Sequence, residues 1–201
     1  MRKRVFIYLL GIFFVSLGIV LCKKCNLGIS PISSIPFVLE EIVPLSFGTL
    51  TMLFHLVNIL FQLILLREVW NVRILLQIPV AFLFGQVIDL LQRLIHFDSG
   101  FLAAQVTVLI FSIFFTALGM VCMIRMDLVQ NPPDGLVKIL SQKTGRELGR
   151  IKILYDAACV VISAALGHAI LGEMRGMGIA TVVSAVFVGR TVTWMKEKAK
   201  L

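Results

Sequence analysis

Several ionisable and amide side chains lie within otherwise apolar stretches of this sequence and could bind a proton, an ion or a polar solute. Such groups are costly in apolar surroundings, so they usually face the interior of a helical bundle and pair with one another or with a ligand. We therefore predict a polar interior layer. Its candidate members are His55, Asn58, Gln86, Asp89, Asp156 and Arg190.

Members of this layer also have structural interpretations. His55 could hydrogen-bond a neighbouring helix, while Asp89 and Arg190 lie near the ends of their apolar stretches, where an ion pair would suffice. We place Asp156 in the first turn of its helix, with Lys152 four residues before it. There its charge could serve only to match the helix dipole. The sequence alone leaves both interpretations open.

Two polar segments that contain proline, residues 26–34 and 127–135, form a second group of candidates. In each, a serine or an asparagine precedes proline, which is typical of an N-cap followed by the first helical residue. The free N–H groups at such a helix start can bind an anionic or hydrogen-bonding ligand. The candidate substrate-binding residues are Ser30, Pro31, Ser33, Ser34, Asn131, Pro132 and Asp134.

The composition indicates a membrane protein. Of the 201 residues, 59% are hydrophobic and only 15% are charged, and the mean hydropathy is +0.98. A water-soluble domain carries about 25% charged residues, so this chain has too few to cover its surface in water. The net charge of +8 does not indicate nucleic acid binding, because the basic residues lie at the edges of apolar stretches instead of forming one patch.

No metal ion or other cofactor is predicted. Cys22 and Cys25 match a C-x-x-C pattern, but no second pair of cysteine or histidine residues accompanies them. A structural zinc site needs four ligands. Enzyme motifs such as H-E-x-x-H and G-x-S-x-G are absent as well. We therefore expect that the chain is not an enzyme.

The apolar stretches predict an all-α membrane protein with six transmembrane helices. A spanning helix needs about 20 mostly apolar residues. The six stretches are Val5–Cys22, Gly48–Leu66, Ile74–Leu94, Phe101–Ile124, Ile153–Leu171 and Met177–Met195. Two further helical segments, residues 31–43 and 132–143, are too short to cross, because a dozen residues rise only about 18 Å. Each short helix is either re-entrant in the bilayer or lies flat on its surface.

The distribution of lysine and arginine predicts the orientation of these spans. With six spans and a cytoplasmic N-terminus, 15 of the 19 basic residues lie on the cytoplasmic side and 4 lie outside. If both short segments also crossed, the division would be 12 against 7. Because cytoplasmic loops carry an excess of basic residues, we predict six spans with both termini in the cytoplasm.

The second half of the sequence repeats the order of features in the first half. A shift of 101 residues superposes Leu17-Gly18 on Leu118-Gly119, Asn26-Leu27 on Asp127-Leu128, Pro31 on Pro132, and Phe47-Gly48 on Leu148-Gly149. After a three-residue insertion, Phe84-Gly85 falls on Val188-Gly189. We predict two units, residues 1–100 and 101–201, within one membrane domain. Since each unit has three spans, the second enters from the opposite face, as in inverted-repeat transporters.

Two short motifs resemble those of a known family. A Gly-Ile-Ser-Pro turn (Gly28–Pro31) follows the first span, and Phe-Gly-Thr (Phe47–Thr49) opens the next one. In this the chain resembles the YczE/YyaS/YitT-like bacterial integral membrane proteins over most of its length. The resemblance implies a multi-pass protein of the bacterial inner membrane, but no substrate, because that family is largely uncharacterised. In the second half Asn131 stands in place of serine before the proline, so the two helix starts need not have the same function.

These features predict a membrane permease for a small polar or anionic solute, with its site at the starts of the two short helices. The expected partners are the lipid bilayer and that solute, and the sequence leaves a homo-oligomer open. A membrane scaffold or regulatory subunit that transports nothing is the alternative, favoured if the short helices lie on the surface. An intramembrane enzyme is the least favoured, because proton sharing between His55 and Asp156 would need a geometry that sequence cannot give.

Overall fold

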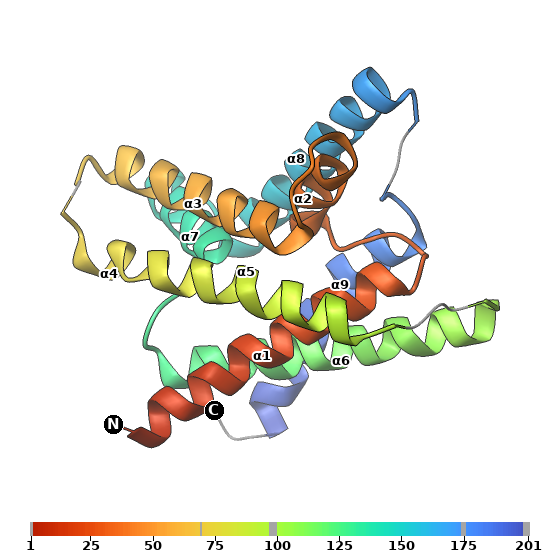
Figure 1. Ribbon diagram of the computed structural model, residues 1–201. Coiled ribbons are helices and arrows are strands. Elements are labelled where there is room, and N and C mark those ends of the chain that lie inside the picture. Colours follow the sequence, from red (N-terminus) through yellow and green to blue (C-terminus); the bar gives the residue numbers. More distant parts are fainter. Residues whose placement is uncertain (1, 69, 97–99, 174–175, 199–201) are drawn as a thin grey trace.

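The described part of the chain is helical, with turns between the helices and no strand (Figure 1). The computed structural model describes residues 2–68, 70–96, 100–173 and 176–198. Its elements are α1 (Arg2–Lys24), α2 (Pro31–Ile42), α3 (Phe47–Leu66), α4 (Val72–Leu75), α5 (Gln77–Leu94), α6 (Leu102–Met126), α7 (Pro132–Thr144), α8 (Leu148–Leu166), the π-helix η1 (Gly167–Leu171) and α9 (Ile179–Lys198). The prediction of an all-α protein is confirmed.

Five helical stretches among the described residues are long and apolar enough to cross a membrane. They are α1, α3, α4 with α5, α6, and α8 with η1. The chain thus has the helices of a multi-pass membrane protein. α9 is 20 residues long but is not among the five, and it carries Arg190 and, in its last turn, Lys196 and Lys198.

Several helix starts follow the local sequence. Pro31 and Pro132 are the first residues of α2 and α7, after Ser30 and Asn131. Only the start of α8 differs clearly from the prediction. It begins at Leu148 and not near Ile153, because an apolar stretch marks only the apolar part of a helix and the start of α8 carries the basic residues Arg150 and Lys152. Asp156 therefore lies in the third turn, which excludes the predicted role as a charge in the first turn.

Glycine allows α1 and α6 to cross in close contact. A Cβ atom on Gly11 would lie 2.9 Å from the carbonyl oxygen of Gly119, and one on Gly119 would lie 2.5 Å from that of Gly11. One and a half to two turns away, a Cβ on Gly18 would lie 2.7 Å from the carbonyl oxygen of Ser112, whose hydroxyl donates to the Gly18 carbonyl at 2.8 Å. Such close approach is typical of packed transmembrane helices with small residues at the contact.

The other helices pack around this crossing in two groups. α5 packs against α1 and α3, and α9 packs against α6. The short helix α2 lies against α8 and α3, and the short helix α7 lies against α3 and α8. By contrast, α8 and α9 are not packed along each other.

The helix ends are distributed on two sides of the molecule. In Figure 1 the start of α1, the end of α3 and the short helix α4 lie at the left of the view. The end of α5, the start of α6 and the end of α8 lie at the right. The long helices therefore run back and forth between the same two sides, as successive membrane spans would.

Candidate functional site

A row of polar side chains follows one face of α3. Thr51, His55, Asn58 and Gln62 are spaced by four, three and four residues, which places them on one side of the helix. All four are buried. We call these residues the α3 polar row. Because buried polar groups are normally hydrogen-bonded, this face points at other protein groups and not at lipid.

A second polar row lies on α8. It consists of Lys152, Tyr155, Asp156, Cys159 and Ser163, again at the spacing of one helix face. Cys159 and Ser163 are buried and the other three are partly buried. We call these residues the α8 polar row. Most other side chains of α8 are exposed and apolar, so this row is the side of α8 that contacts the rest of the protein.

The start of α7 contacts the α3 polar row through Gln62. The Gln62 amide donates to the carbonyl oxygen of Pro132 at 2.9 Å and to Oε1 of Gln77, at the start of α5, also at 2.9 Å. The Gln77 amide donates back to Gln62 Oε1 at 3.0 Å. Both glutamines are buried. This pair of amides therefore fixes the first turn of α7 against α3 and α5.

Lys152 connects the start of α7 to the α8 polar row. Its Nζ atom lies 3.3 Å from Oδ1 of Asp134 and 3.4 Å from Oδ1 of Asp156. Asn131 Nδ2 also donates to Oδ2 of Asp134, at 3.3 Å. Asp134 lies in the first turn of α7, where the helix dipole favours a carboxylate. The positive end of α7 is therefore already matched by a negative group of the chain itself.

The start of α2 is held by the other end of the α8 polar row. The Ser34 hydroxyl donates to the carbonyl oxygen of Pro31 at 2.7 Å and lies 3.3 Å from that of Cys159. The Ser163 hydroxyl donates to the Ser34 carbonyl oxygen at 3.1 Å. Ser30 donates to the buried Ser33 hydroxyl at 3.0 Å and not to a backbone group of α2. The predicted residues of this segment thus lie at the α2–α8 contact.

The two polar rows meet at Tyr155 and Asn58. The Tyr155 hydroxyl donates to Oδ1 of Asn58 at 2.6 Å, and Nδ2 of Asn58 donates to the Phe54 carbonyl oxygen at 2.7 Å. Both rows, and through them both short helices, therefore belong to one polar region.

Tyr155→Phe should lower the free energy of unfolding by about 1–2 kcal/mol, because the buried Asn58 Oδ1 atom loses its donor. Thermal unfolding in detergent would measure the loss. Tyr8→Phe is the matched control, since the Tyr8 hydroxyl donates to the Val129 carbonyl oxygen at 3.0 Å, outside this region. We expect a similar loss of stability from the control. Wild-type stability of Tyr155→Phe would contradict the importance of this contact.

Three buried polar atoms in this region have no hydrogen-bond partner. They are Nδ1 of His55, Oδ1 of Asn131 and Oδ1 of Asp156, although the last of these atoms makes the ion pair with Lys152. The ring of His55 packs edge-on against Phe84, with the ring centroids 5.5 Å apart. Unpaired buried polar atoms are uncommon in folded proteins, and a bound ion or polar ligand is one explanation for them.

Three predicted members of the interior layer lie elsewhere. Asp89 caps the start of α3, where its Oδ1 accepts from the Gly48 N–H at 2.8 Å and its Oδ2 from the Ser46 hydroxyl at 2.5 Å. Gln86 and Arg190 are exposed, on α5 and α9. The structure brings His55, Asn58 and Asp156 into one region. Asp89, Gln86 and Arg190 lie outside that region. Asp89 instead caps the start of α3, a role that differs from the ion pair given above as its structural interpretation.

Several residues of this region are not among the candidates that the sequence predicts. Tyr155 and Gln77 were not predicted, and Lys152 was considered only as a neighbour of Asp156. The spacing of residues 152, 155, 156, 159 and 163 along one helix face was the signal that could have revealed the α8 polar row. No comparable signal exists for Gln77, because its partner Gln62 belongs to another helix.

Comparison with known proteins gives a family but no function. A model of a protein family of unknown function, DUF6198, matches residues 2–197. No curated protein and no solved structure matches the chain.

Proposed function

The chain belongs to DUF6198, a family of unknown function, and we propose that it is a permease that moves a small polar solute by alternating access. One observation carries the proposal: both short helices begin at polar rows that meet at the Tyr155–Asn58 hydrogen bond. Helix starts at membrane depth are tolerated only where they are buried in protein or line a polar pathway. Paired helix starts of this kind form the solute sites of many secondary transporters.

An inverted repeat is part of this proposal and is supported by equivalent contacts. Under the shift of 101 residues, Gly11 corresponds to Ser112 and Gly18 corresponds to Gly119. The contact of Gly11 with Gly119 therefore has the contact of Gly18 with Ser112 as its equivalent. A two-fold relation between the two halves would produce such a pair.

The contacts that hold the two short helices are also equivalent in the two units. Gln62 on α3 binds the start of α7, and Ser163 on α8 binds the start of α2. Gln62 and Ser163 occupy equivalent repeat positions. A long helix of each unit thus holds the short helix of the other unit. We propose that this exchange couples the two units, residues 1–100 and 101–201, when the protein changes conformation.

We further propose six spans, with α9 as the sixth and both termini in the cytoplasm of the bacterial inner membrane. A helix of 20 residues, as α9 is, can cross a hydrocarbon core of about 30 Å. The excess of basic residues gives the orientation. The resemblance to YczE/YyaS/YitT-like proteins, which rests on Gly28–Pro31 and Phe47–Thr49, belongs to this proposal as well.

The charges of the site favour a solute that donates hydrogen bonds. When ionised, Asp134, Asp156 and Lys152 together carry one net negative charge. Oδ1 of Asn131, which has no hydrogen-bond partner, and Oδ1 of Asp156, which has only its ion pair with Lys152, are acceptors only. The start of α7 would favour an anion by itself, but Asp134 already occupies that position. We therefore propose a small cationic or donor-rich solute instead of an anionic one.

Uptake of guanidinium into proteoliposomes tests this function. We expect the protein to transport guanidinium faster than tetramethylammonium, which has no N–H donor, and faster than acetate or inorganic phosphate. Asp156→Asn should lower guanidinium uptake about tenfold or more, because it weakens a charge-assisted hydrogen bond to the solute. The exposed Gln86→Leu variant is the matched control and should transport normally. Background uptake of all four probes, or preferred uptake of an anion, would contradict the proposal.

A further inference from the structure

The start of α3 is closely joined to α5 in the first unit. A Cβ atom on Gly48 would overlap the carbonyl oxygen of Gly85, and one on Gly85 would lie 2.8 Å from the carbonyl oxygen of Gly48. Beside this contact, the Ser46 hydroxyl donates to Asp89 Oδ2 at 2.5 Å. The two glycines and the two hydrogen bonds that Asp89 accepts, from Ser46 and from the Gly48 N–H, thus join the start of α3 to α5.

The second unit contains the same residue pattern without the contact. Gly149 on α8 corresponds to Gly48, and Gly189 on α9 corresponds to Gly85. Apart from the backbone of its own helix, no described atom lies within 4 Å of a Cβ built on either Gly149 or Gly189. The helices α8 and α9 are not packed along each other, whereas α3 and α5 are.

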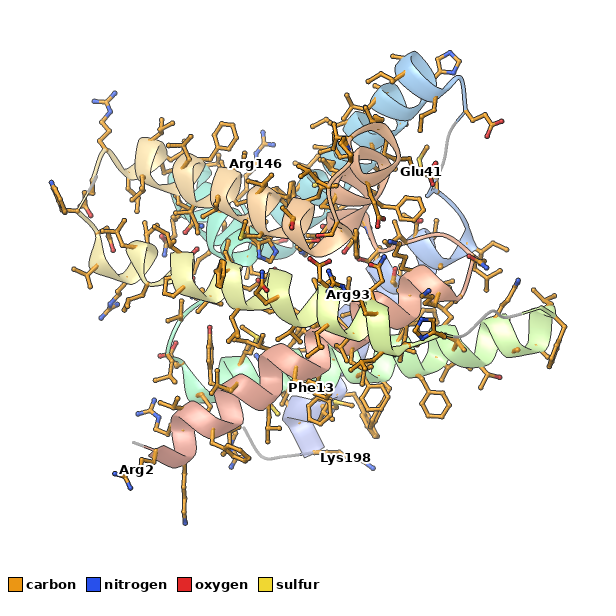
Figure 2. All side chains as sticks on the ribbon, viewed as in Figure 1. Arg2, Phe13, Glu41, Arg93, Arg146 and Lys198 are labelled. Atoms are coloured by element: carbon orange, nitrogen blue, oxygen red, sulfur yellow. The ribbon has the colours of Figure 1, made fainter. Side chains whose placement is uncertain are left out.

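No hydrogen bond joins the side chains beside these two glycines in the described part of the chain. The positions that correspond to Ser46 and Asp89 hold Glu147 and Thr193, both of which are exposed. In Figure 2, Arg146, just before α8, and Lys198, the last residue of α9, lie far apart in the view. Only 17% of the apolar window in α8 with η1 is buried, against 33–44% for the other four spanning stretches.

We infer that α9 closes onto α8 in a second conformation and that this contact is the cytoplasmic gate of the protein. The inference rests on the inverted repeat of the proposed function. In an inverted repeat, the contact made by one unit on one side of the membrane is available to the other unit on the opposite side. The structure then has its outer side closed, through α3 and α5, and its cytoplasmic side open, between α8 and α9.

The chemistry of the two surfaces fits this contact. Gly149 and Gly189 leave room for the backbones to approach, as Gly48 and Gly85 do. Ser46 donates to Asp89 in the first unit, and in the second unit Thr193 could donate to the Glu147 carboxylate. The donor and the acceptor have exchanged helices, but the pair remains complementary. The α8–α9 contact would thus be joined by the same kind of hydrogen bond as the α3–α5 contact.

Disulfide trapping in the full chain tests the gate. The native cysteines are first replaced by alanine, and the protein is reconstituted in proteoliposomes and oxidised with copper phenanthroline. In the Glu147→Cys/Thr193→Cys variant, we expect a disulfide within one chain. It should form about 10 to 1,000 times more slowly than in the Ser46→Cys/Asp89→Cys control, because a minor conformation is populated at about 0.1–10%. Glu147→Cys/Phe187→Cys, with the second cysteine about 9 Å further along α9, should form none.

The outcomes separate the gate from the proposed function. If residues 147 and 193 form no disulfide while residues 46 and 89 do, the gate is overturned, even if the wild type transports guanidinium. A disulfide between two chains would also overturn it, because the open face would then be a dimer contact. If a disulfide forms within one chain but the wild type takes up no guanidinium, the closure of α9 onto α8 is supported and the proposed permease function is contradicted.

Gly189→Leu provides a second test. Because nothing lies near Gly189 in this conformation, the variant should fold and keep the wild-type melting temperature. In the closed conformation its side chain would collide with α8. Introduced into the Glu147→Cys/Thr193→Cys background, it should therefore prevent the disulfide. Disulfide formation as fast as in the parent would overturn the inference.

Discussion

Gly48→Ala should lower the free energy of unfolding by about 1–3 kcal/mol, because the added methyl group has no room. It would overlap the Gly85 carbonyl oxygen and lie 2.5 Å from Cγ of Asp89, which caps the same helix. Neither a backbone carbonyl nor a capping carboxylate can move aside cheaply. Thermal unfolding in detergent, followed by circular dichroism, would measure the change.

Gly149→Ala is the matched control for this variant. Gly149 is the second residue of α8, as Gly48 is of α3, but no atom lies within 4 Å of its added Cβ. Alanine is favoured over glycine in a helix by about 1 kcal/mol at most. We therefore expect unchanged or slightly higher stability. Equal destabilisation by both variants would contradict the difference between the two units.

Lys152→Met should destabilise the protein by about 1–3 kcal/mol and abolish solute uptake. It removes the only positive charge within 4 Å of Asp134 and Asp156 among the described residues, so two carboxylates remain facing each other. Breaking a fully buried ion pair costs about 3–5 kcal/mol. The cost is smaller here because the Lys152 side chain is 31% exposed. The melting temperature and guanidinium uptake would be measured together.

Two further variants show whether the lost charge is the cause of the destabilisation by Lys152→Met. Asp134→Asn combined with Lys152→Met should recover part of the lost stability, because one uncompensated carboxylate is removed. Arg150→Met breaks an ion pair with Glu147 in which both side chains are more than three-quarters exposed, so little change is expected. If the double variant were less stable than Lys152→Met alone, the electrostatic explanation would be wrong.

The sequence predicts the helices well because their signals are local. Ser30-Pro31 and Asn131-Pro132 mark the starts of α2 and α7 to the residue, and long apolar stretches mark the membrane-crossing helices. The missed start of α8 has the same physical basis. Residues that lie outside an apolar stretch can still be helical when they carry polar side chains.

Which face of a helix is buried is harder to predict in a membrane protein. In a soluble helix, polar residues mark the outside, but lipid makes the outside apolar as well. The spacing of Thr51, His55, Asn58 and Gln62 reveals a face because four polar groups repeat on it. Gln86 and Arg190 also have a polar residue three positions further on, Asp89 and Thr193, so spacing alone could not show that Gln86 and Arg190 are exposed.

Contacts between distant segments remained beyond sequence analysis. The ion pair of Lys152 with Asp134 depends on α7 packing against α8, and the Gln62–Gln77 pair depends on α3 packing against α5. Short-range spacing carries no information on such packing. The repeat was the one long-range signal, and it places Gln62 and Ser163 at equivalent positions before any contact is known.

Thiol labelling of Cys159 tests alternating access most directly. Cys159 lies in the α8 polar row, one turn after Tyr155, and the Ser34 hydroxyl lies 3.3 Å from its carbonyl oxygen. In a chain whose other three cysteines are replaced by alanine, a membrane-impermeant maleimide would be added to either side of oriented proteoliposomes. The proposed mechanism predicts labelling from both sides, faster from the cytoplasmic side. Labelling from neither side, or from one side only, would contradict it.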